Sequence, residues 1–408
     1  MGAPQGADPG GWMMADRSGA VAELTRSDYD ATMADYVRDG ERRARELGNR
    51  GPARFDADGR LAADILDAYW EHGFYVFEGV VGTGEVDELR ADAQEMVERA
   101  PVRRGAKLDA QGRPAHGRDL AVEPYLMIKP LSDPWGGTDK LAGRHPSKMT
   151  EPVPDAGAPD EVPYLMFGMC QSVPAALRLY GHPVVLGIAA AVNGDDFVPY
   201  NDAIFVKQPG LGGSVAWHQD GVTHWDSPNW DMGIHGFNFQ VQLYRTTGAN
   251  ALWVVPGTHR SGRVDIKAMV AANGSDRLAE AIPLLCEPGD MTIVNRQTLH
   301  GSFANTSPDP RVSVTFGFHR RSSVLGVKGK LALKGDDLAW TEAPAYDEER
   351  IFERSAVIAV AIDARRQHFP DEAPFVYRPF AGLEDDFRYD EATFERVIRD
   401  YNTKDLAI

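Results

Sequence analysis

Runs in which apolar and polar residues alternate dominate the middle of the chain and predict β-strands, whose side chains point to opposite faces in turn. After Arg311, for example, apolar residues fall at every second position, at Val312, Val314 and Phe316. Glycine and proline separate the runs from one another, as turns require. The predicted strands cover residues 203–208, 214–220, 236–245, 251–255, 291–295 and 311–320. Many short strands with such punctuation are typical of a β-sandwich or barrel.

Helical spacing of apolar residues precedes and follows this β-rich region. The stretch 61–72 has Leu61, Ile65 and Tyr69 at helical spacing, and it leads into an extended run at 74–81. Further helices are predicted at residues 27–48, 84–100, the first part of 172–192, 343–369 and 390–402. The pattern therefore predicts a mainly β fold with flanking helices that support it.

The regular pattern is interrupted in three places, which suggest how the chain is organised. Residues 1–20 are rich in glycine and show little periodicity, so we expect them to be disordered. Residues 21–320 are expected to form one domain, in which 131–163 is a long irregular insertion, either a lid or binding loop or a mobile surface segment. Residues 321–408 are expected to be a partly helical extension packed on the same domain, where they cover the active site, form a subunit interface or support the barrel.

Charge and cysteine content narrow the class of protein. The 408 residues carry a formal net charge of −17, which argues against nucleic acid or an anionic membrane as the main partner. We find no apolar run of about 18 residues, and no secretory signal at the start of the chain. Cys170 and Cys286 lie in apolar surroundings, so we expect buried, reduced thiols. These observations favour a cytoplasmic protein. The sequence does not distinguish a monomer from a homodimer.

Candidate chemistry begins with Trp217-His218-Gln219-Asp220, followed much later in the chain by His300. Two imidazoles and one carboxylate, the first pair spaced His-x-Asp, match the facial triad that binds Fe(II) in non-haem oxygenases. Residues two apart on a strand point to the same face, so His218 and Asp220 can hold one ion. We expect His300 to end a second strand that lies alongside. Because a His-x-Asp pair alone occurs by chance in many sequences, the assignment depends on its surroundings.

A polar turn connects His300 to Arg311, which opens the next predicted strand. This connection would place a guanidinium near the metal ligand. The fixed fork of arginine donors matches a carboxylate, so Arg311 suggests an anionic organic cosubstrate. The alternative is an ordinary surface residue at a turn.

Four segments, in this order, carry a resemblance to the phytanoyl-CoA dioxygenase (PhyH-like) family of Fe(II)/2-oxoglutarate oxygenases. They are Gly73–Val81 with the acidic helix after it, Trp217–Asp220, Leu252–Arg260 with its Pro-Gly-Thr-His turn, and Gly289–Val294 continuing to His300–Ser302 and Arg311. The ordered combination is more specific than any single motif. The resemblance implies a double-stranded β-helix (jelly-roll, cupin-like) core that uses Fe(II), 2-oxoglutarate and O2. It also implies the Fe(II) ligands His218, Asp220 and His300.

The resemblance further implies roles for three residues near the cosubstrate. Arg311 would pair with the distal carboxylate of 2-oxoglutarate, and Ser302 would supply a hydroxyl to the same carboxylate unless it is an ordinary turn serine. Gln240 departs from the family, which often has an aromatic residue near this point; it would contact 2-oxoglutarate or substrate, or only line the barrel. No side chain beyond the metal ligands is expected to act in catalysis.

The sequence after the triad bears on the substrate. It is rich in aromatic residues, and His224 and Trp225 are candidates for substrate contact, or else packed loop residues. We find no dense basic cluster suited to the phosphates of CoA. Because Asp220 is present, oxygen insertion or desaturation is favoured over halogenation. We therefore expect a dioxygenase that oxidises, most simply hydroxylates, a C–H bond of a small or medium-sized metabolite and releases succinate and CO2.

Two other classes of protein remain open. A cupin-type isomerase or hydrolase would keep the metal ligands but would need neither Arg311 nor Ser302. A non-catalytic jelly-roll binding protein would be expected to have a broken triad. Within the oxygenases, hydroxylation, desaturation, epoxidation and ring formation share one iron site, so the sequence does not distinguish them.

Overall fold

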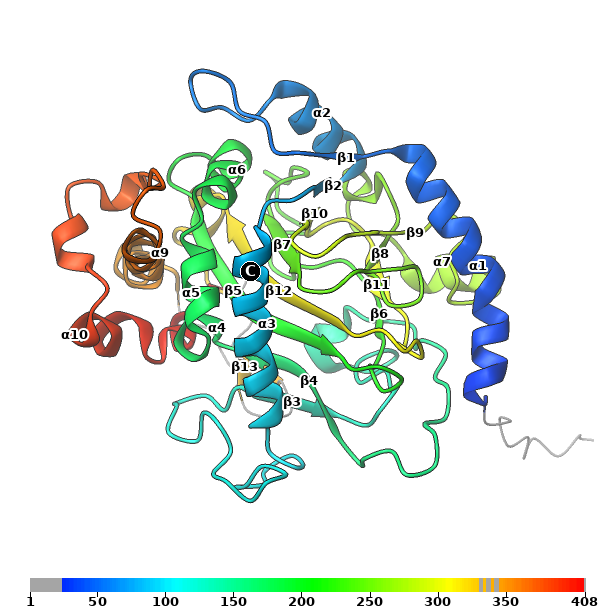
Figure 1. The fold of residues 1–408 in the computed structure, drawn as a ribbon. Coiled ribbons are helices and arrows are strands. Elements are labelled where there is room, and N and C mark those ends of the chain that lie inside the picture. The colour runs from blue at the N-terminus through cyan, green and yellow to red at the C-terminus, as the bar shows by residue number, and fades with distance from the viewer. Residues whose placement is uncertain (1–23, 330–332, 335–338, 341–344, 407–408) are drawn as a thin grey trace, which may run out of the picture.

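The computed structural model describes residues 24–329, 333–334, 339–340 and 345–406. The disorder expected at residues 1–20 lies outside this part of the chain. Two β-sheets pack against each other, and helices surround them (Figure 1). Apolar residues from both sheets, among them Val76 and Val294 from one and Val254 and Ile282 from the other, share a buried cluster.

The larger sheet has eight strands in the order β1–β2–β10–β7–β12–β5–β4–β3. All neighbouring strands are antiparallel except β1 and β2. The strands are β1 Arg50–Gly51, β2 Phe74–Phe77, β3 Tyr125–Ile128, β4 Val162–Phe167, β5 Val198–Lys207, β7 Phe237–Gln242, β10 Met291–Asn295 and β12 Arg311–His319.

The smaller sheet has four strands in the order β6–β11–β8–β9. They are β6 Val215–His218, β8 Trp253–Val254, β9 Ile282–Pro283 and β11 His300–Ser302; a separate hairpin pairs β13 Leu333–Lys334 with β14 Ala339–Trp340. Successive strands from β5 to β12 alternate between the two sheets, except that β8 and β9 both lie in the smaller sheet. This winding is a double-stranded β-helix, so the predicted jelly-roll core is confirmed.

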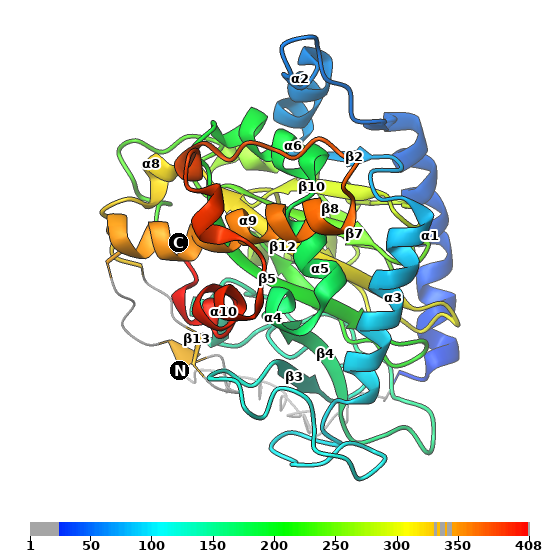
Figure 2. The ribbon, with the colours of Figure 1, turned by 60° about the vertical axis from the view of Figure 1, so that its left-hand side comes forward.

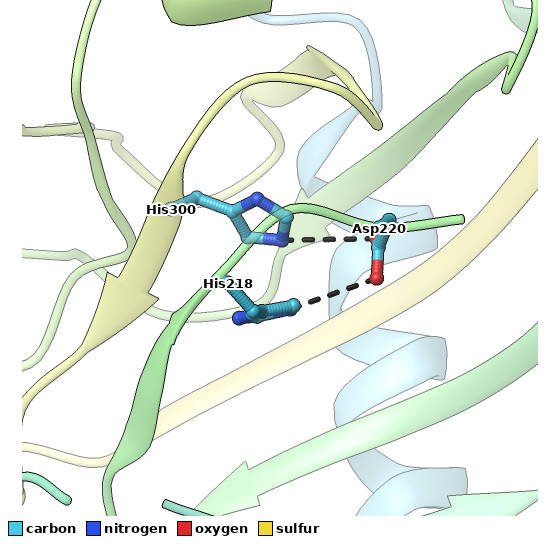
Figure 3. A group of neighbouring side chains, drawn as sticks. All are labelled: His218, Asp220 and His300. Atoms are coloured by element: carbon cyan, nitrogen blue, oxygen red, sulfur yellow. Dashed lines mark ion pairs between the residues drawn. The ribbon is translucent and has the colours of Figure 1, made fainter. Parts of the chain in front are cut away.

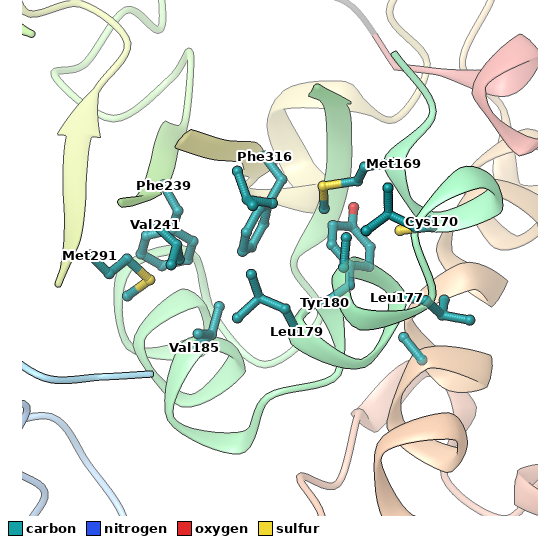
Figure 4. Packing of buried hydrophobic residues seen from close by; sticks show 14 of the residues in the cluster. Met169, Cys170, Leu177, Leu179, Tyr180, Val185, Phe239, Val241, Met291 and Phe316 are labelled. Carbon is teal, nitrogen blue, oxygen red and sulfur yellow. The ribbon is translucent and has the colours of Figure 1, made fainter. Parts of the chain in front are cut away.

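Helices cover the outer face of the larger sheet. They are α3 Thr83–Glu98, α5 Pro174–Tyr180, α6 Pro183–Asn193 and α9 Glu348–His368. Figure 4 shows Leu179 and Val185 packed beside Phe239, Val241 and Phe316 of the sheet. Because strand side chains alternate, the residues between these apolar ones point into the barrel.

The first helix, α1 Arg26–Leu47, packs on the smaller sheet. It begins at Thr25, whose hydroxyl accepts a hydrogen bond from the Asp28 amide, and ends at the left-handed Gly48. Tyr36 stacks on the indole of Trp253 with ring centroids 4.5 Å apart. A Cβ at Gly40 would lie 2.4 Å from the same indole, so the close approach of helix and sheet requires glycine there.

The remaining helices are short and lie in connections. They are α2 Ala63–His72, α4 Met169–Ser172, α7 Ile266–Asn273, α8 Arg321–Val324 and α10 Glu391–Thr393, with a π-helical turn at Phe394–Ile398 and 3₁₀ turns at Lys140–Gly143, Thr258–Ser261, Arg378–Phe380, Glu384–Phe387 and Tyr401–Lys404. Within the described residues, no single helix has the length and apolar composition needed to cross a membrane; α5 and α6 pass that test only together, with a 45° bend between them.

The region after β12 packs on the jelly roll. Figure 2 shows α9 and α10 on the same side of the molecule as α5. Arg354 of α9 is buried; its Nη2 donates to the Tyr200 carbonyl at 3.0 Å and its Nε donates to Asp405 at 2.8 Å. The predicted helix at 343–369 is thus α9, whereas 390–402 is divided into α10, a π-helical turn and the start of a 3₁₀ turn. The proposed domain boundaries stay a prediction.

The strand predictions locate β2, β5, β6, β7, β8, β10 and β12. His300 opens β11 instead of ending a strand, and β1, β3, β4, β9, β13 and β14 were not predicted as strands. Within the smaller sheet, β9 and β11 are too short to show an alternating pattern, since they have two and three residues. Their pairing with β8 fixes them in the sheet.

Candidate metal centre

Two neighbouring strands of the smaller sheet bring the two histidines together. His218 is the last residue of β6 and His300 the first of β11, and they face each other in the antiparallel register. Asp220 lies just beyond the end of β6 instead of on the strand as expected, and its amide donates to the Arg296 carbonyl at 2.6 Å. The carboxylate is therefore held by the loop between β10 and β11, not by strand alternation.

The three side chains converge on one point (Figure 3). His218 Nε2 lies 3.6 Å from Asp220 Oδ1, and His300 Nε2 lies 3.7 Å from Asp220 Oδ2. One ligand atom from each residue lies within 4.8 Å of the others, and within the described residues this is the group of three that could hold a metal ion. The side chains of His218, Asp220 and His300 are nearly closed to solvent, with exposures of 7, 9 and 9%.

Backbone carbonyls orient both imidazoles. His218 Nδ1 lies 2.8 Å from the Ala216 carbonyl, and His300 Nδ1 lies 2.8 Å from the Thr298 carbonyl. A carbonyl only accepts, so each Nδ1 carries the proton and each Nε2 offers its lone pair towards Asp220. Metal-binding histidines are commonly oriented through the second ring nitrogen in this way.

Electrostatics give the three groups the protonation states of metal ligands. Burial lowers the pKa of His218 well below its usual value and also lowers the pKa of His300. Burial alone would raise the pKa of Asp220, but Arg144, then the two histidines and Arg296, outweigh it and lower this pKa. Two neutral imidazoles and one carboxylate result at neutral pH.

Two buried basic side chains lie on neighbouring strands of the larger sheet. Arg311 opens β12 directly across from Lys207, the last residue of β5. Lys207 Nζ donates to the Ser302 hydroxyl and to the Phe303 carbonyl, each at 2.7 Å. Arg311 is 2% exposed, and its Nη2 donates to Gln240 Oε1 at 2.8 Å. Burial lowers the pKa of Arg311 to about 10, which leaves it charged at neutral pH.

The inner face of the larger sheet carries polar atoms that lack partners. Five such atoms are buried without a hydrogen-bond partner in the described structure: Arg311 Nε, Gln242 Oε1, Thr292 Oγ1, Ser313 Oγ and Thr315 Oγ1. Buried polar groups are normally paired. An anion with several oxygens would accept from the guanidinium and the hydroxyls, so these residues fit a dicarboxylate cosubstrate, just as the triad fits a divalent metal.

The structure brings most of the predicted site residues together and places the other two on a loop. The three ligands lie together, and Arg311, Gln240 and Ser302 line the neighbouring polar interior. His224 and Trp225 lie on the loop after Asp220. His224 Nε2 lies 2.8 Å from the Ser323 carbonyl, and Trp225 Nε1 donates to the Gly221 carbonyl at 2.9 Å. Their contact with substrate stays a prediction.

Several residues that sequence reasoning missed also surround the triad. Asn238 Nδ2 donates to Asp220 Oδ2 at 2.8 Å, and Arg144 Nη1 lies 3.0 Å from Asp220 Oδ1. Asn238 is two residues before Gln240 on β7, and Lys207 lies within the predicted strand 203–208, so alternation contained a signal for both. Arg144 lies in the irregular insertion, where no pattern predicts a position.

Comparison with known proteins agrees with the predicted resemblance. The sequence profile of the family "Phytanoyl-CoA dioxygenase (PhyH)" matches residues 69–313. The chain is 31% identical to phytanoyl-CoA dioxygenase 1 of Oryza sativa subsp. japonica over 116 residues, which is 26% of this chain and 38% of the rice protein. The match thus spans well under half of that relative.

Similar solved structures are more distant. AviO1 from Streptomyces viridochromogenes Tue57 is 18% identical, with a TM-score of 0.43 over 69% of this chain and 97% of that one. EctD from S. alaskensis with 2-oxoglutarate and 5-hydroxyectoine is 18% identical, with a TM-score of 0.47 over 72% and 89%. The family profile covers more than half of the chain and includes the metal triad and Arg311. The chain belongs to the phytanoyl-CoA dioxygenase (PhyH) family.

Proposed function

We propose that this protein is an Fe(II)- and 2-oxoglutarate-dependent dioxygenase that oxidises, most simply hydroxylates, a C–H bond of a small or medium-sized metabolite. The products from the cosubstrate are succinate and CO2. The observation that carries the proposal is the triad His218, Asp220 and His300 together with buried Arg311, which lies across from Lys207, the residue that donates to Ser302 on the strand that His300 opens.

The triad is proposed to hold Fe(II). Two imidazoles and one carboxylate on one side of the ion are the donor set of non-haem iron oxygenases, and they leave the other side open. When bound, iron would supply the O2-dependent oxidising chemistry, coupled to decarboxylation of 2-oxoglutarate. Asn238 holds Asp220 Oδ2 at 2.8 Å, so it orients the carboxylate towards the histidines.

Arg311 is proposed to bind the distal carboxylate of 2-oxoglutarate. Its Nη2 is directed by Gln240, and its Nε has no hydrogen-bond partner among the described residues. Ser302 accepts from Lys207 at 2.7 Å, which leaves the Ser302 proton available for the same carboxylate. Gln240 would then act by positioning Arg311, and Lys207 would add a second cation or donor.

The barrel is proposed to protect the reaction from water. The ligands are almost fully buried, and the proposed chemistry needs no side-chain acid or base beyond them. A buried site of this kind fixes the ligands and keeps reactive species from solvent. His224 and Trp225, on the loop beside the triad, remain the proposed substrate contacts.

A cytoplasmic location is part of the proposal. Cys170 and Cys286 are free and buried, as expected for a reducing compartment. The oligomeric state, monomer or homodimer, stays a prediction.

The test is anaerobic addition of Fe(II) and 2-oxoglutarate to metal-free protein. We expect the weak visible charge-transfer band of an iron-chelated 2-oxoacid, and its loss in His300→Ala. Appearance of succinate with a suitable substrate would follow. If no band forms while another divalent metal binds tightly, a cupin-type isomerase or hydrolase replaces the dioxygenase. If no metal binds at all, a non-catalytic jelly-roll binding protein replaces the dioxygenase as the interpretation.

A further inference from the structure

The insertion at 131–163 reaches the metal centre through Arg144. The side chain is 17% exposed, and its Nη1 lies 3.0 Å from Asp220 Oδ1. Arg144 Nε is buried and has no hydrogen-bond partner among the described residues. The guanidinium therefore lies at the triad with most of its donors unused, since arginine has five N–H groups.

Asp220 brings one negative charge to two guanidinium groups. Arg296 Nε lies 3.9 Å from Asp220 Oδ2, opposite the side that Arg144 contacts. Arg296 has other partners, because it lies 4.0 Å over the Tyr200 ring and donates to the His235 carbonyl at 2.9 Å. In the described structure, Asp220 is the anionic partner of Arg144.

Binding of Fe(II) and 2-oxoglutarate would take Asp220 away from Arg144. Fe(II) and 2-oxoglutarate carry opposite formal charges of equal size, so together they add no net charge. Asp220 would then serve the metal, and the distal carboxylate of 2-oxoglutarate would go to Arg311. A nearly buried guanidinium without an anion is costly, so Arg144 would be left to bind a further anion beside the iron.

His145 provides a second sign that a ligand belongs here. Its side chain is fully buried, its ring lies 4.2 Å from the His218 ring, and neither ring nitrogen has a hydrogen-bond partner among the described residues. An imidazole can donate through one ring nitrogen and accept through the other. Two adjacent residues of the insertion thus present unsatisfied polar atoms to the site.

The insertion is folded so that it presents these residues. Asp133 accepts hydrogen bonds from the Gly136 amide at 2.9 Å and the Met149 amide at 2.8 Å, which joins the two ends of the segment around Arg144. Trp135 packs beside His145 with ring centroids 5.4 Å apart. The position of Arg144 is therefore built by the segment and is not that of a freely moving surface arginine.

We propose that Arg144 recognises a carboxylate of the organic substrate, so that the substrate class is an acid whose oxidised carbon lies near its carboxylate. Arg144 pairs with Asp220 in the free protein and transfers to the substrate carboxylate in the loaded one. The inference rests on the proposed iron and 2-oxoglutarate site and extends it to the substrate.

The test uses small acids and their uncharged amides as probes. Hexanoate is compared with hexanamide, and benzoate with benzamide, by titration calorimetry on the full chain held anaerobically with Fe(II) and saturating 2-oxoglutarate. We expect each carboxylate to bind at least roughly tenfold more tightly than its amide, the effect of one charge-assisted pair. The preference should disappear in Arg144→Gln and persist in part in Arg144→Lys, which keeps the charge without the fork.

The matched control is Lys140→Gln, which removes one positive charge from an exposed position of the same segment and should leave the preference unchanged. The visible 2-oxoacid band of each variant verifies an intact site. If the band forms but the preference is absent, or survives in Arg144→Gln because iron itself binds the acids, the substrate inference is wrong and the dioxygenase proposal stands. If wild type gives no band, both are wrong.

Discussion

Two buried groups of arginine and aspartate lie on opposite faces of the larger sheet and differ in their balance of charge. At the metal centre, one carboxylate, Asp220, faces Arg144 and Arg296. On the outer face, one guanidinium, Arg354, lies 3.5 Å from Asp202 and 2.8 Å from Asp405. The first group has an excess of cations and the second an excess of acids.

The different balance of charge shifts the pKa of the aspartates in opposite directions in the two groups. Burial would raise the pKa of Asp220, but Arg144 and its neighbours lower it, so this carboxylate is ionised and ready for a metal ion. On the outer face burial dominates: it raises the pKa of Asp202, and it raises the pKa of Asp405 to about 7. Tyr401 further donates to Asp202. The outer group pairs within the chain and joins the C-terminal region to the barrel, whereas the proposed ligands would complete the inner group.

The largest expected effect follows from removing a metal ligand. His218→Ala should abolish Fe(II) binding and turnover, because two remaining ligands do not hold the ion, and even loss of a supporting contact typically costs 10–100-fold. Folding stability should change little, since the ring is part of a site and not of an apolar cluster. Metal content by atomic absorption and activity by succinate release check this. Full activity in the variant would disprove the triad assignment.

Removal of Arg354 should lower the stability of the fold and leave metal binding unchanged, the opposite of what we expect for His218→Ala. Arg354→Ala leaves Asp202 buried without its cation, and breaking a buried pair typically costs about 3–5 kcal/mol. We expect the urea midpoint to fall sharply while Fe(II) affinity of the folded protein is unchanged. Arg388→Ala, which breaks the exposed pair with Asp385, is the control and should change stability little. Equal losses in the two variants would contradict a structural role for the outer group.

Arg311→Gln should act on the cosubstrate alone. Loss of a charge-assisted pair of about 1.5–3 kcal/mol raises the 2-oxoglutarate concentration required by roughly 10- to 150-fold. Fe(II) binding should persist, because Arg311 contacts Gln240 and no metal ligand. Titration of the visible band with 2-oxoglutarate measures the change. An unchanged 2-oxoglutarate affinity would mean that Arg311 does not bind the cosubstrate.

The sequence predicted the parts of the site that depend on local pattern. His218 and Arg311 belong to alternating strands, and the His-x-Asp spacing together with the later His300 was enough to indicate a metal site. The reason given for Asp220 was wrong, because a backbone hydrogen bond to Arg296, and not strand alternation, fixes it.

The parts that the sequence did not predict depend on tertiary contacts. Arg144 and His145 lie in a segment with no periodicity, so their position over the triad follows only from how Asp133 folds that segment. Similarly, the register that sets Lys207 across from Arg311 is a property of the paired strands β5 and β12. Alternation indicates which face a residue occupies, but not which residue lies opposite.

The smallest expected effect is a pH dependence of stability that comes from the outer group. In the folded protein the pKa of Asp405 is about 7, above the value of about 3.9 for an unfolded chain. Between these values the folded state binds more protons than the unfolded state, so this group's contribution to stability falls as the pH rises from about 4 to about 7. Because a quarter of the Asp405 side chain is exposed, we expect a loss of only about 1–2 kcal/mol, well below the full linkage value.

Asp405→Asn isolates this contribution, because the amide cannot ionise but still accepts a hydrogen bond from Arg354. Urea unfolding of wild type and variant at a series of pH values gives the difference in stability, in which the other carboxylates cancel. The variant should gain relative to wild type as the pH rises towards 7 and then level off. Asp385→Asn, at an exposed position, should give a flat difference. A flat difference for Asp405→Asn as well would mean that Arg354 keeps both acids ionised, and that the outer and inner groups do not differ in the way their charge balance indicates.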